Sequence, residues 1–346
     1  MATTIKQFSE ANNLFATNLF AFMDPGFVYS PASLSFVLAL LQQGCAGNTK
    51  EQINKLLRDK FNMEQVAFVN SIYNNDITKL STAILILNNN IKESYVDDIG
   101  KIAQIYNANA QNLDKTLKAI NKYFSENTND LIRNAISNND INESTNMVLI
   151  NTLYFRAAWS QPFDPANTKE KMFNEKIPVS MMTNTKHYGY FEDARVQILR
   201  MTYKKDFCMD VILPNIDVNT INMYNYLDDK LNFTNEYIRV FLPKFIHKRK
   251  MNMIPILKLM GLIDIFTPSA NLKPMCEGPN MINKFVHEVI VDVNEKGTEA
   301  AAATKVSAAK CEPPEPILFN ANHTFVYCIR HLVTNMILFV GEFDGK

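Results

Sequence analysis

The sequence lacks the features of a membrane protein, a nucleic-acid binder and an exported protein. Its 346 residues carry 35 Lys+Arg and 35 Asp+Glu, whereas nucleic-acid binding requires a net basic surface. No apolar run approaches the roughly 18 residues that span a bilayer, and polar residues occupy the N-terminal stretch where a signal peptide has its apolar core. We therefore expect a cytoplasmic protein with no nucleic-acid or membrane partner. Release by a route that needs no signal peptide stays open.

The sequence also has few cysteines, and they lie far apart. The five cysteines are Cys45, Cys208, Cys276, Cys311 and Cys328. A disulfide framework or a zinc site would show an even number or close pairs. We expect reduced thiols, no metal and no cofactor, and we expect the sequons at Asn142, Asn232 and Asn322 to stay bare.

Standard catalytic motifs are missing as well. There is no Gly-x-Ser-x-Gly elbow. His287-Glu288 begins a zincin-like motif, but Val291 stands where the second His is needed. The stretch Gly44–Lys50 lacks the Gly-Lys-Ser/Thr ending of a phosphate loop. We expect no catalytic residues and no enzyme.

Two hydrophobic periodicities alternate along the chain. Helical spacing occurs in Phe8–Met23, Ala32–Gln43, Asn112–Phe124 and Met253–Leu262. Strand-like runs occur in Val148–Phe155, Phe207–Leu213, Tyr237–Phe245, Phe285–Val293, Phe325–Ile329 and Met336–Phe343. Helices early and strands late predict an α+β fold.

One long segment, between Val293 and Ile317, does not fit a compact domain, because structureless connections beyond about 15 residues are uncommon and usually functional or disordered. Neither proline nor glycine interrupts Thr298–Glu312, so the segment can become a strand. Its alternate residues are small or β-branched: Thr298, Ala300, Ala302, Thr304, Val306 and Ala308. A helix over Ala300–Ala303 is the alternative.

This segment, read with its flanks, closely resembles the hinge and reactive-centre loop of a serpin. The matching stretch runs from Val291 through Glu295 and Gly297 to Thr304. Other family blocks follow in order: Tyr29-Ser30-Pro31-Ala32-Ser33 with Gly44 and Gly47-Asn48-Thr49; Asn151-Thr152-Leu153-Tyr154-Phe155 with Trp159; Val179-Ser180-Met181-Met182; Leu242-Pro243-Lys244-Phe245; His287; Phe325 to Ile329 with Arg330 and His331; and Leu338-Phe339-Val340-Gly341. The resemblance covers nearly the whole chain.

The resemblance implies a single domain over residues 1–346, with three β-sheets, about nine helices and an exposed reactive-centre loop at about 294–316. It also implies a metastable fold that inhibits a serine protease as a suicide substrate. The protease cuts the loop, the freed N-terminal side inserts into the main sheet, and the attached protease is distorted. Insertion of such a loop into a β-sheet is a known form of strand addition.

The resemblance assigns roles to three groups of residues. The hinge comprises Gly297, Thr298, Glu299, Ala300, Ala301, Ala302, Ala303 and Thr304. The shutter, a polar network under the central strands, comprises Ser30, Ser33, Asn151 and His287. The breach, where the loop first enters, comprises Trp159, Lys244 and Glu295, with Lys244 and Glu295 expected to form an ion pair. Thr324 and Glu342 depart from the family's pattern outside this machinery.

Two neighbouring peptide bonds are candidates for the one that the protease attacks. Family spacing from Gly297 places the specificity residue at Cys311, with cleavage before Glu312, whereas a loop one residue shorter places it at Lys310. A lysine suits the acidic pocket of a trypsin-like protease, which favours the bond between Lys310 and Cys311. A cysteine protease is the alternative target, and an exposed Cys311 thiol would be open to oxidation.

A non-inhibitory serpin, acting as a chaperone or binding protein, is the second interpretation of the sequence. Non-inhibitory members often have bulky or charged hinge residues, whereas Thr298, Ala300, Ala302 and Thr304 are small and uncharged. The sequence therefore favours an inhibitor, expected to be a monomer with a target protease as its partner.

Overall fold

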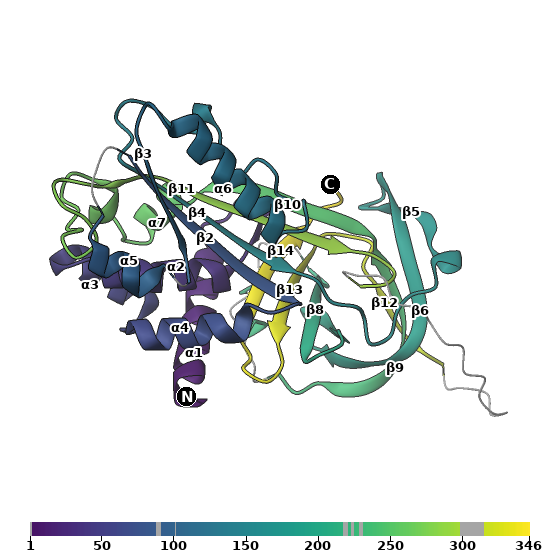
Figure 1. Cartoon of the computed structure of the whole chain (residues 1–346). Coiled ribbons are helices and arrows are strands. Elements are labelled where there is room, and N and C mark those ends of the chain that lie inside the picture. Colours follow the sequence, from purple (N-terminus) through teal and green to yellow (C-terminus); the bar gives the residue numbers. More distant parts are fainter. Residues whose placement is uncertain are drawn as a thin grey trace. The chain divides into compact units, whose positions relative to one another are not determined.

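The computed structural model describes residues 2–87, 91–100, 102–216, 221–222, 225–227, 231–297 and 315–346. These residues form seven α-helices: α1 (Ala2–Phe20), α2 (Pro31–Gly44), α3 (Gly47–Leu57), α4 (Met63–Tyr73), α5 (Glu93–Ile99), α6 (Leu113–Asn127) and α7 (Ile254–Leu259) (Figure 1). In the described part of the chain, none of the helices has the length and apolarity that a bilayer crossing requires.

Fourteen strands accompany these helices in the described residues. They are β1 (Val28–Tyr29), β2 (Thr78–Leu87), β3 (Gln104–Ala108), β4 (Met147–Phe155), β5 (Lys169–Phe173), β6 (Ile177–Glu192), β7 (Val196–Thr202), β8 (Phe207–Pro214), β9 (Thr234–Pro243), β10 (Phe245–Asn252), β11 (Ile282–Val293), β12 (Ile317–Asn320), β13 (Phe325–His331) and β14 (Ile337–Phe343). The α+β class predicted from the sequence is confirmed.

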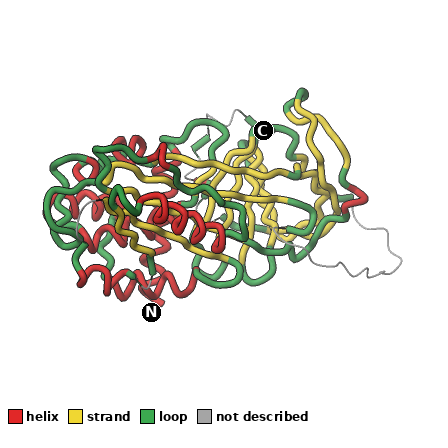
Figure 2. Tube along the Cα trace, turned by 45° about the horizontal axis from the view of Figure 1, so that its top comes forward, coloured by secondary structure: helices red, strands yellow, loops and turns green. Residues whose placement is uncertain are grey.

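The chain forms two compact units, each assembled from separate stretches of sequence. The first comprises Met1–Met23, Tyr29–Tyr154 and Lys248–Ile290, and the second Asp24–Val28, Phe155–His247 and Val291–Lys346. All seven described α-helices belong to the first unit (Figure 2).

Most residues of a five-stranded sheet with the order β10-β11-β4-β2-β3 belong to the first unit. Its central strands β11 and β4 run parallel, with Cα partners from Ile282 and Met147 to Val289 and Leu153. Helix α2 begins at Pro31, whose fixed φ suits the first helical position, and the Ser30 side chain caps it by accepting a hydrogen bond from the Ser33 N–H.

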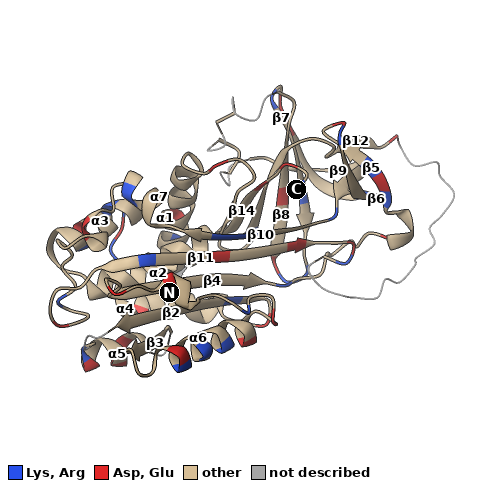
Figure 3. Ribbon diagram, turned by 90° about the horizontal axis from the view of Figure 1, so that it is seen from above, with Lys and Arg blue, Asp and Glu red and all other residues tan. Residues whose placement is uncertain are grey.

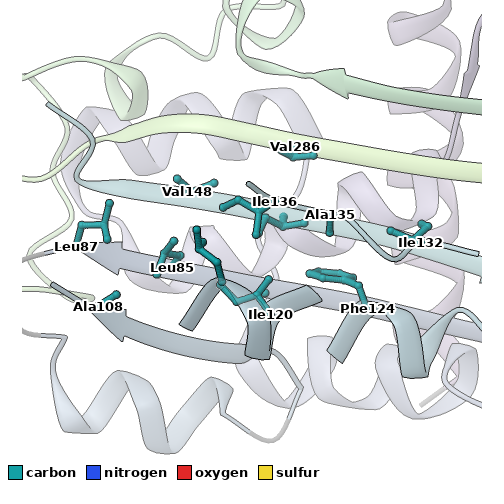
Figure 4. Close-up of a cluster of buried hydrophobic side chains, with 13 residues drawn as sticks. Leu85, Leu87, Ala108, Ile120, Phe124, Ile132, Ala135, Ile136, Val148 and Val286 are labelled. Carbon is teal, nitrogen blue, oxygen red and sulfur yellow. The ribbon is translucent and has the colours of Figure 1, made fainter. Parts of the chain in front are cut away.

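Helix α6 covers part of this sheet with an apolar stripe. Leu117, Ile120 and Phe124 recur three and four residues apart, so they share one face of the helix. They pack in a buried cluster with side chains of β2, β4 and β11, including Ile150 and Val286 (Figure 4). The even-numbered positions of β4 and β11 therefore face α6.

The second unit contains a nine-stranded sheet, with the order β1-β14-β13-β8-β7-β6-β9-β12 and β5 paired to β6. The family resemblance implied three sheets, whereas the described residues form two. The physical reason lies in β6, whose 16 residues pair with β9 over Met181–Tyr190 and with β7 over Gly189–Glu192. One long strand thus joins two sheets into one hydrogen-bonded array.

The helix count is also lower than the nine or so expected. Besides the seven α-helices, the described residues include helical turns of only three residues each, at Asn138–Asp140, Pro165–Asn167 and Asp264–Phe266. A turn of this length closes a single 3₁₀ ring and stops.

Candidate functional site

The four predicted shutter residues meet in one buried polar cluster in the first unit. Ser30 and Ser33 lie at the start of α2, Asn151 lies on β4 and His287 on β11, and all four are 0% exposed. The Ser33 Oγ donates to Asn151 Oδ1 at 2.7 Å, and His287 Nδ1 lies 3.1 Å from the same oxygen. The Ser30 N–H donates to His287 Nε2 at 3.0 Å. Sequence positions up to 257 residues apart are thus joined in one network.

These bonds fix the tautomer of His287. A backbone N–H can only donate, so Nε2 must accept from Ser30 and Nδ1 must carry the proton that goes to Asn151 Oδ1. Burial, which disfavours the charged ring, lowers the pKa of His287 to about 3. The cluster is therefore built around a neutral imidazole.

Thr82 is a further member of this cluster that the sequence did not single out. Asn151 Nδ2 donates to its Oγ1 at 3.3 Å, which extends the network from β4 to β2. Asn151 thereby accepts on its oxygen and donates on its nitrogen, so it links β4 to β11 through His287 and to β2 through Thr82. The odd-numbered residues Asn151 and His287 face α2, on the side of the sheet opposite α6.

The end of β11 turns back in a short hairpin at the start of the predicted hinge. The Asn294 N–H donates to Gly297 O at 3.2 Å and the Gly297 N–H donates to Asn294 O at 3.1 Å. Gly297 has φ 109°, and a Cβ there would lie 2.5 Å from Trp159 N and 2.6 Å from Ala157 O. Both the backbone conformation and the close approach require glycine.

Trp159, Lys244 and Glu295, the predicted breach residues, lie together around this hairpin in the second unit. The indole Nε1 of Trp159 donates to Asn294 O at 2.9 Å, and its backbone N–H donates to Lys296 O at 3.0 Å. The indole also stacks on Tyr203, with ring centroids 4.0 Å apart. Trp159 thus holds the turn by its side chain and its backbone together.

Glu295 forms the expected ion pair with Lys244, at 3.0 Å between Oε2 and Nζ. Its other oxygen accepts from Thr168 Oγ1 at 2.9 Å. Burial alone would raise the pKa of Glu295, but hydrogen bonds from its own backbone, Lys244 and Thr168 outweigh burial and hold that pKa below its usual value. Asn294, Thr168 and Tyr203 were not found from the sequence, since only their positions in space connect them to Trp159 and Glu295.

The remaining predicted site residues lie outside the described residues. These are the hinge residues Thr298–Thr304 and the candidates for the attacked bond, Lys310, Cys311 and Glu312. The described chain resumes at Glu315, and β12 begins at Ile317.

The family model "Serpin (serine protease inhibitor)" matches residues 10–344 of the chain. An uncharacterized serpin-like protein of Acanthamoeba polyphaga mimivirus is 31% identical, with 97% of this chain and 89% of the relative covered. Serpin B6 of Pongo abelii is also 31% identical, over 97% of this chain and 99% of the relative. The chain superimposes on the crystal structure of a serpin from the insect Tenebrio molitor with a TM-score of 0.82 at 26% identity, covering 100% of this chain and 97% of that one.

The chain therefore belongs to the serpin family. The family model describes serine protease inhibitors and not enzymes.

Proposed function

We propose that this serpin inhibits a serine protease by suicide trapping, and that its residues 1–346 act as one domain whose reactive-centre loop spans about 294–316. After cleavage, the hinge would enter between β4 and β11 as a new strand. The observation that carries this proposal is the hairpin at Asn294–Gly297, which turns the chain back antiparallel to β11 at the point where the loop begins.

The side chains of the loop fit the two faces that they would meet. If the hairpin is continued residue by residue, Thr298, Ala300, Ala302 and Thr304 come to lie opposite Val293, Val291, Val289 and His287. Directly opposed residues share a face of the sheet, so these four would enter the packed side that faces α2. All four are small and uncharged, which supports insertion without a cavity or a buried charge.

The hydrogen bonds gained are sufficient to drive an irreversible step. About ten to twenty new backbone bonds, at a net 0.5–1.5 kcal/mol each, contribute on the order of 10–20 kcal/mol. This sum is comparable to the whole stability of a typical domain, about 5–15 kcal/mol. An uncut form lacking these bonds would be metastable relative to the inserted form.

A trypsin-like protease is the target that the loop chemistry favours, with cleavage between Lys310 and Cys311. The lysine ammonium suits an acidic specificity pocket, and small Ala308 and Ala309 precede it. Cleavage between Cys311 and Glu312, or a cysteine protease as target, is the alternative within the same mechanism.

The test is to mix the protein with trypsin at near-equal amounts, separate the products on a denaturing gel, and measure the mass of the released peptide. We expect a covalent band at the summed mass, and a released peptide that begins at Cys311. A peptide that begins at Glu312 would move the specificity residue to Cys311.

Two matched hinge variants separate an inhibitor from a binding protein. Thr298→Arg places a charge on the buried face and should convert the inhibitor into a plain substrate, because burying an unpaired charge costs at least several kcal/mol. Glu299→Arg places the same side chain on the opposite face, so it should keep most of the covalent complex. Cleavage of the wild type with neither a complex nor a gain in thermal stability would instead favour the chaperone or binding-protein alternative.

We further propose that the protein works as a monomer in a reducing compartment such as the cytoplasm. Cys45, Cys208, Cys276 and Cys328 are free and buried in the structure. Free thiols of this kind are typical of proteins that fold in a reducing environment.

A further inference from the structure

One end of the nine-stranded sheet has a buried side and an exposed side. It comprises β5, β6, β9 and β12, which all belong to the second unit. Cα partners on neighbouring strands share a side of the sheet. The side chains of one alternation are buried: Met182, Ile238, Val240, Leu242 and Phe319. Those of the other alternation, which we call the outer face, are half-buried or exposed: Thr183, Thr185, His187, Tyr237, Arg239, Phe241, Leu318 and Asn320.

Among the residues of these four strands, the outer face carries cations and no carboxylate. Besides Arg239 it includes Lys171 of β5, whose Nζ lies 3.9 Å from the ring centroid of Phe241. Lys169 precedes Lys171 by two positions and lies on the same side of β5. The strands contain three carboxylates, all of the opposite alternation: Glu170, Glu192 and Glu236. Figure 3 colours the basic positions of these strands blue and the acidic ones red.

These cations are available to a partner from solution. Within the described residues, none of Lys169, Lys171 and Arg239 forms an ion pair. All three are exposed. The only printed contact of their charged groups is that of Lys171 with the ring of Phe241, and a cation over an aromatic face keeps its positive charge. The outer face therefore attracts anionic groups.

Aromatic and aliphatic side chains lie beside the cations on the outer face. Tyr237 packs against the imidazole of His187, with ring centroids 5.2 Å apart. Leu318 of β12 is 54% exposed and is the Cα partner of Arg239. Protein interfaces are enriched in aromatic residues and Arg and depleted of Glu and Asp, relative to the rest of a protein surface. The outer face thus has the composition of an interface.

The partner that fits this face is a protein segment in which carboxylates alternate with apolar side chains. A carboxylate can form two charge-assisted hydrogen bonds with the guanidinium of Arg239. Alternate residues of a strand recur at about 6.8 Å, so the alternate side chains of an extended segment match the row of Tyr237, Arg239 and Phe241 on β9. A nucleic acid has no aliphatic group for Leu318, and the chain has 35 Lys+Arg against 35 Asp+Glu, without the net basic charge of a nucleic-acid binder.

We propose that the outer face of β5, β6, β9 and β12 binds an acidic segment of a second protein. Lys171 and Arg239 hold the carboxylates of that segment, and Tyr237 and Leu318 contact its apolar side chains. This interaction does not depend on loop insertion or on the identity of the attacked bond.

The test is a selection of random peptides displayed on phage, with the immobilised full-length protein as bait. The double variant Lys171→Glu, Arg239→Glu removes peptides that bind elsewhere. We expect the enriched peptides to carry Asp or Glu next to Leu or aromatic residues. One enriched peptide, labelled with a fluorophore, is then titrated with the protein, and its Kd is measured by fluorescence anisotropy. Added salt should weaken this binding, because ions screen exposed charges.

Single variants locate the bound peptide. Arg239→Gln and Tyr237→Ala should each raise its Kd by roughly tenfold, because Arg and Tyr dominate the energetics of interfaces. Lys186→Gln is the matched control, since Lys186 is an exposed lysine of β6 on the opposite alternation. Its loss should change the Kd by less than about twofold, because solvent screens a charge that the peptide does not contact. Melting temperatures equal to that of the wild type show that each variant is folded.

Three results would overturn the proposal. Enriched peptides that lack acidic residues would show that the cations do not select the partner. An acidic peptide with the same Kd for the wild type and for Arg239→Gln would bind somewhere other than the outer face. A single-stranded oligonucleotide of the same net charge that displaces the peptide equally well would show a surface for polyanions in general.

Discussion

The neutral His287 of the shutter cluster makes the stability of the fold depend on pH in a calculable way. In the folded protein its pKa is lowered to about 3 from an ordinary value of 6.5. When the chain unfolds, the ring regains its ordinary pKa and takes up a proton below it. The stability contributed by this group is therefore complete above pH 6.5 and is lost progressively as the pH falls from 6.5 toward 3.

The size of the loss follows from the two pKa values. Each pH unit between them costs about 1.4 kcal/mol. Lowering the pH from about 7.5 to about 5 should therefore reduce the free energy of unfolding by about 2 kcal/mol through His287 alone. Protonation would also place an N–H on Nε2 facing the Ser30 N–H, so the folded cluster has no way to accommodate the charged ring.

The assay is urea unfolding of the uncut protein at several pH values, for the wild type and for His287→Gln. The variant lacks the titrating ring, so its free energy of unfolding should fall by about 2 kcal/mol less over that range. The difference between the two proteins cancels other groups, including His331, whose pKa burial also lowers. His331→Gln provides a comparison and should flatten the profile less, because His331 is only partly buried. Parallel pH profiles for wild type and His287→Gln would refute the role assigned to the buried imidazole.

Two other sites give predictions of a different kind. Gly297→Ala should lower the melting temperature by several degrees, since strain at a positive φ costs about 1–3 kcal/mol and the added Cβ meets the backbone of Ala157 and Trp159. Gly278→Ala is the control: this glycine also has a positive φ, but an added Cβ would meet nothing within 4 Å, so the melting temperature should fall less. Asp210→Asn should destabilise the protein by about 3–5 kcal/mol in urea unfolding, because Asp210 pairs with both Arg200 and the 1% exposed Arg330. The exposed pair of Lys122 and Glu126 provides the control, and Glu126→Gln should cost less than about 0.5 kcal/mol. Equal losses in either pair of variants would contradict the corresponding argument.

The sequence predicted the helices and strands whose periodicity is clear, and missed those whose pattern is ambiguous. The stripe of α6 and the run of β11 were recognisable because one face is apolar. Strand β2 was missed because its buried residues run almost without interruption and include no aromatic residue, so neither period nor composition separates strand from helix, whereas the run of β4 ends in Tyr154 and Phe155. The joining of two sheets through β6 could not be foreseen, since it depends on which neighbours one strand pairs with along its length.

The resemblance named most residues of the candidate site and one of its contacts, the ion pair of Lys244 and Glu295, but not its other hydrogen bonds. The resemblance supplied Ser30, Ser33, Asn151 and His287, yet the tautomer of His287 and the part played by Thr82 follow only from the positions of atoms. Hydrogen bonds between residues distant in sequence leave no local pattern.

The parallel pairing of β11 with β4 has a consequence for the direction in which the sheet can change. Bonds between parallel strands are slanted and the pairing is slightly less stable per residue than an antiparallel one. A strand entering from the hairpin would run antiparallel to both neighbours, and would exchange one slanted ladder for two perpendicular ones. The sheet would thus lose the parallel joint between β11 and β4, while the parallel pair β2–β3 at its edge would stay as it is. Reversal would require breaking two strong ladders to regain one weaker one, so the proposed insertion would be a one-way step.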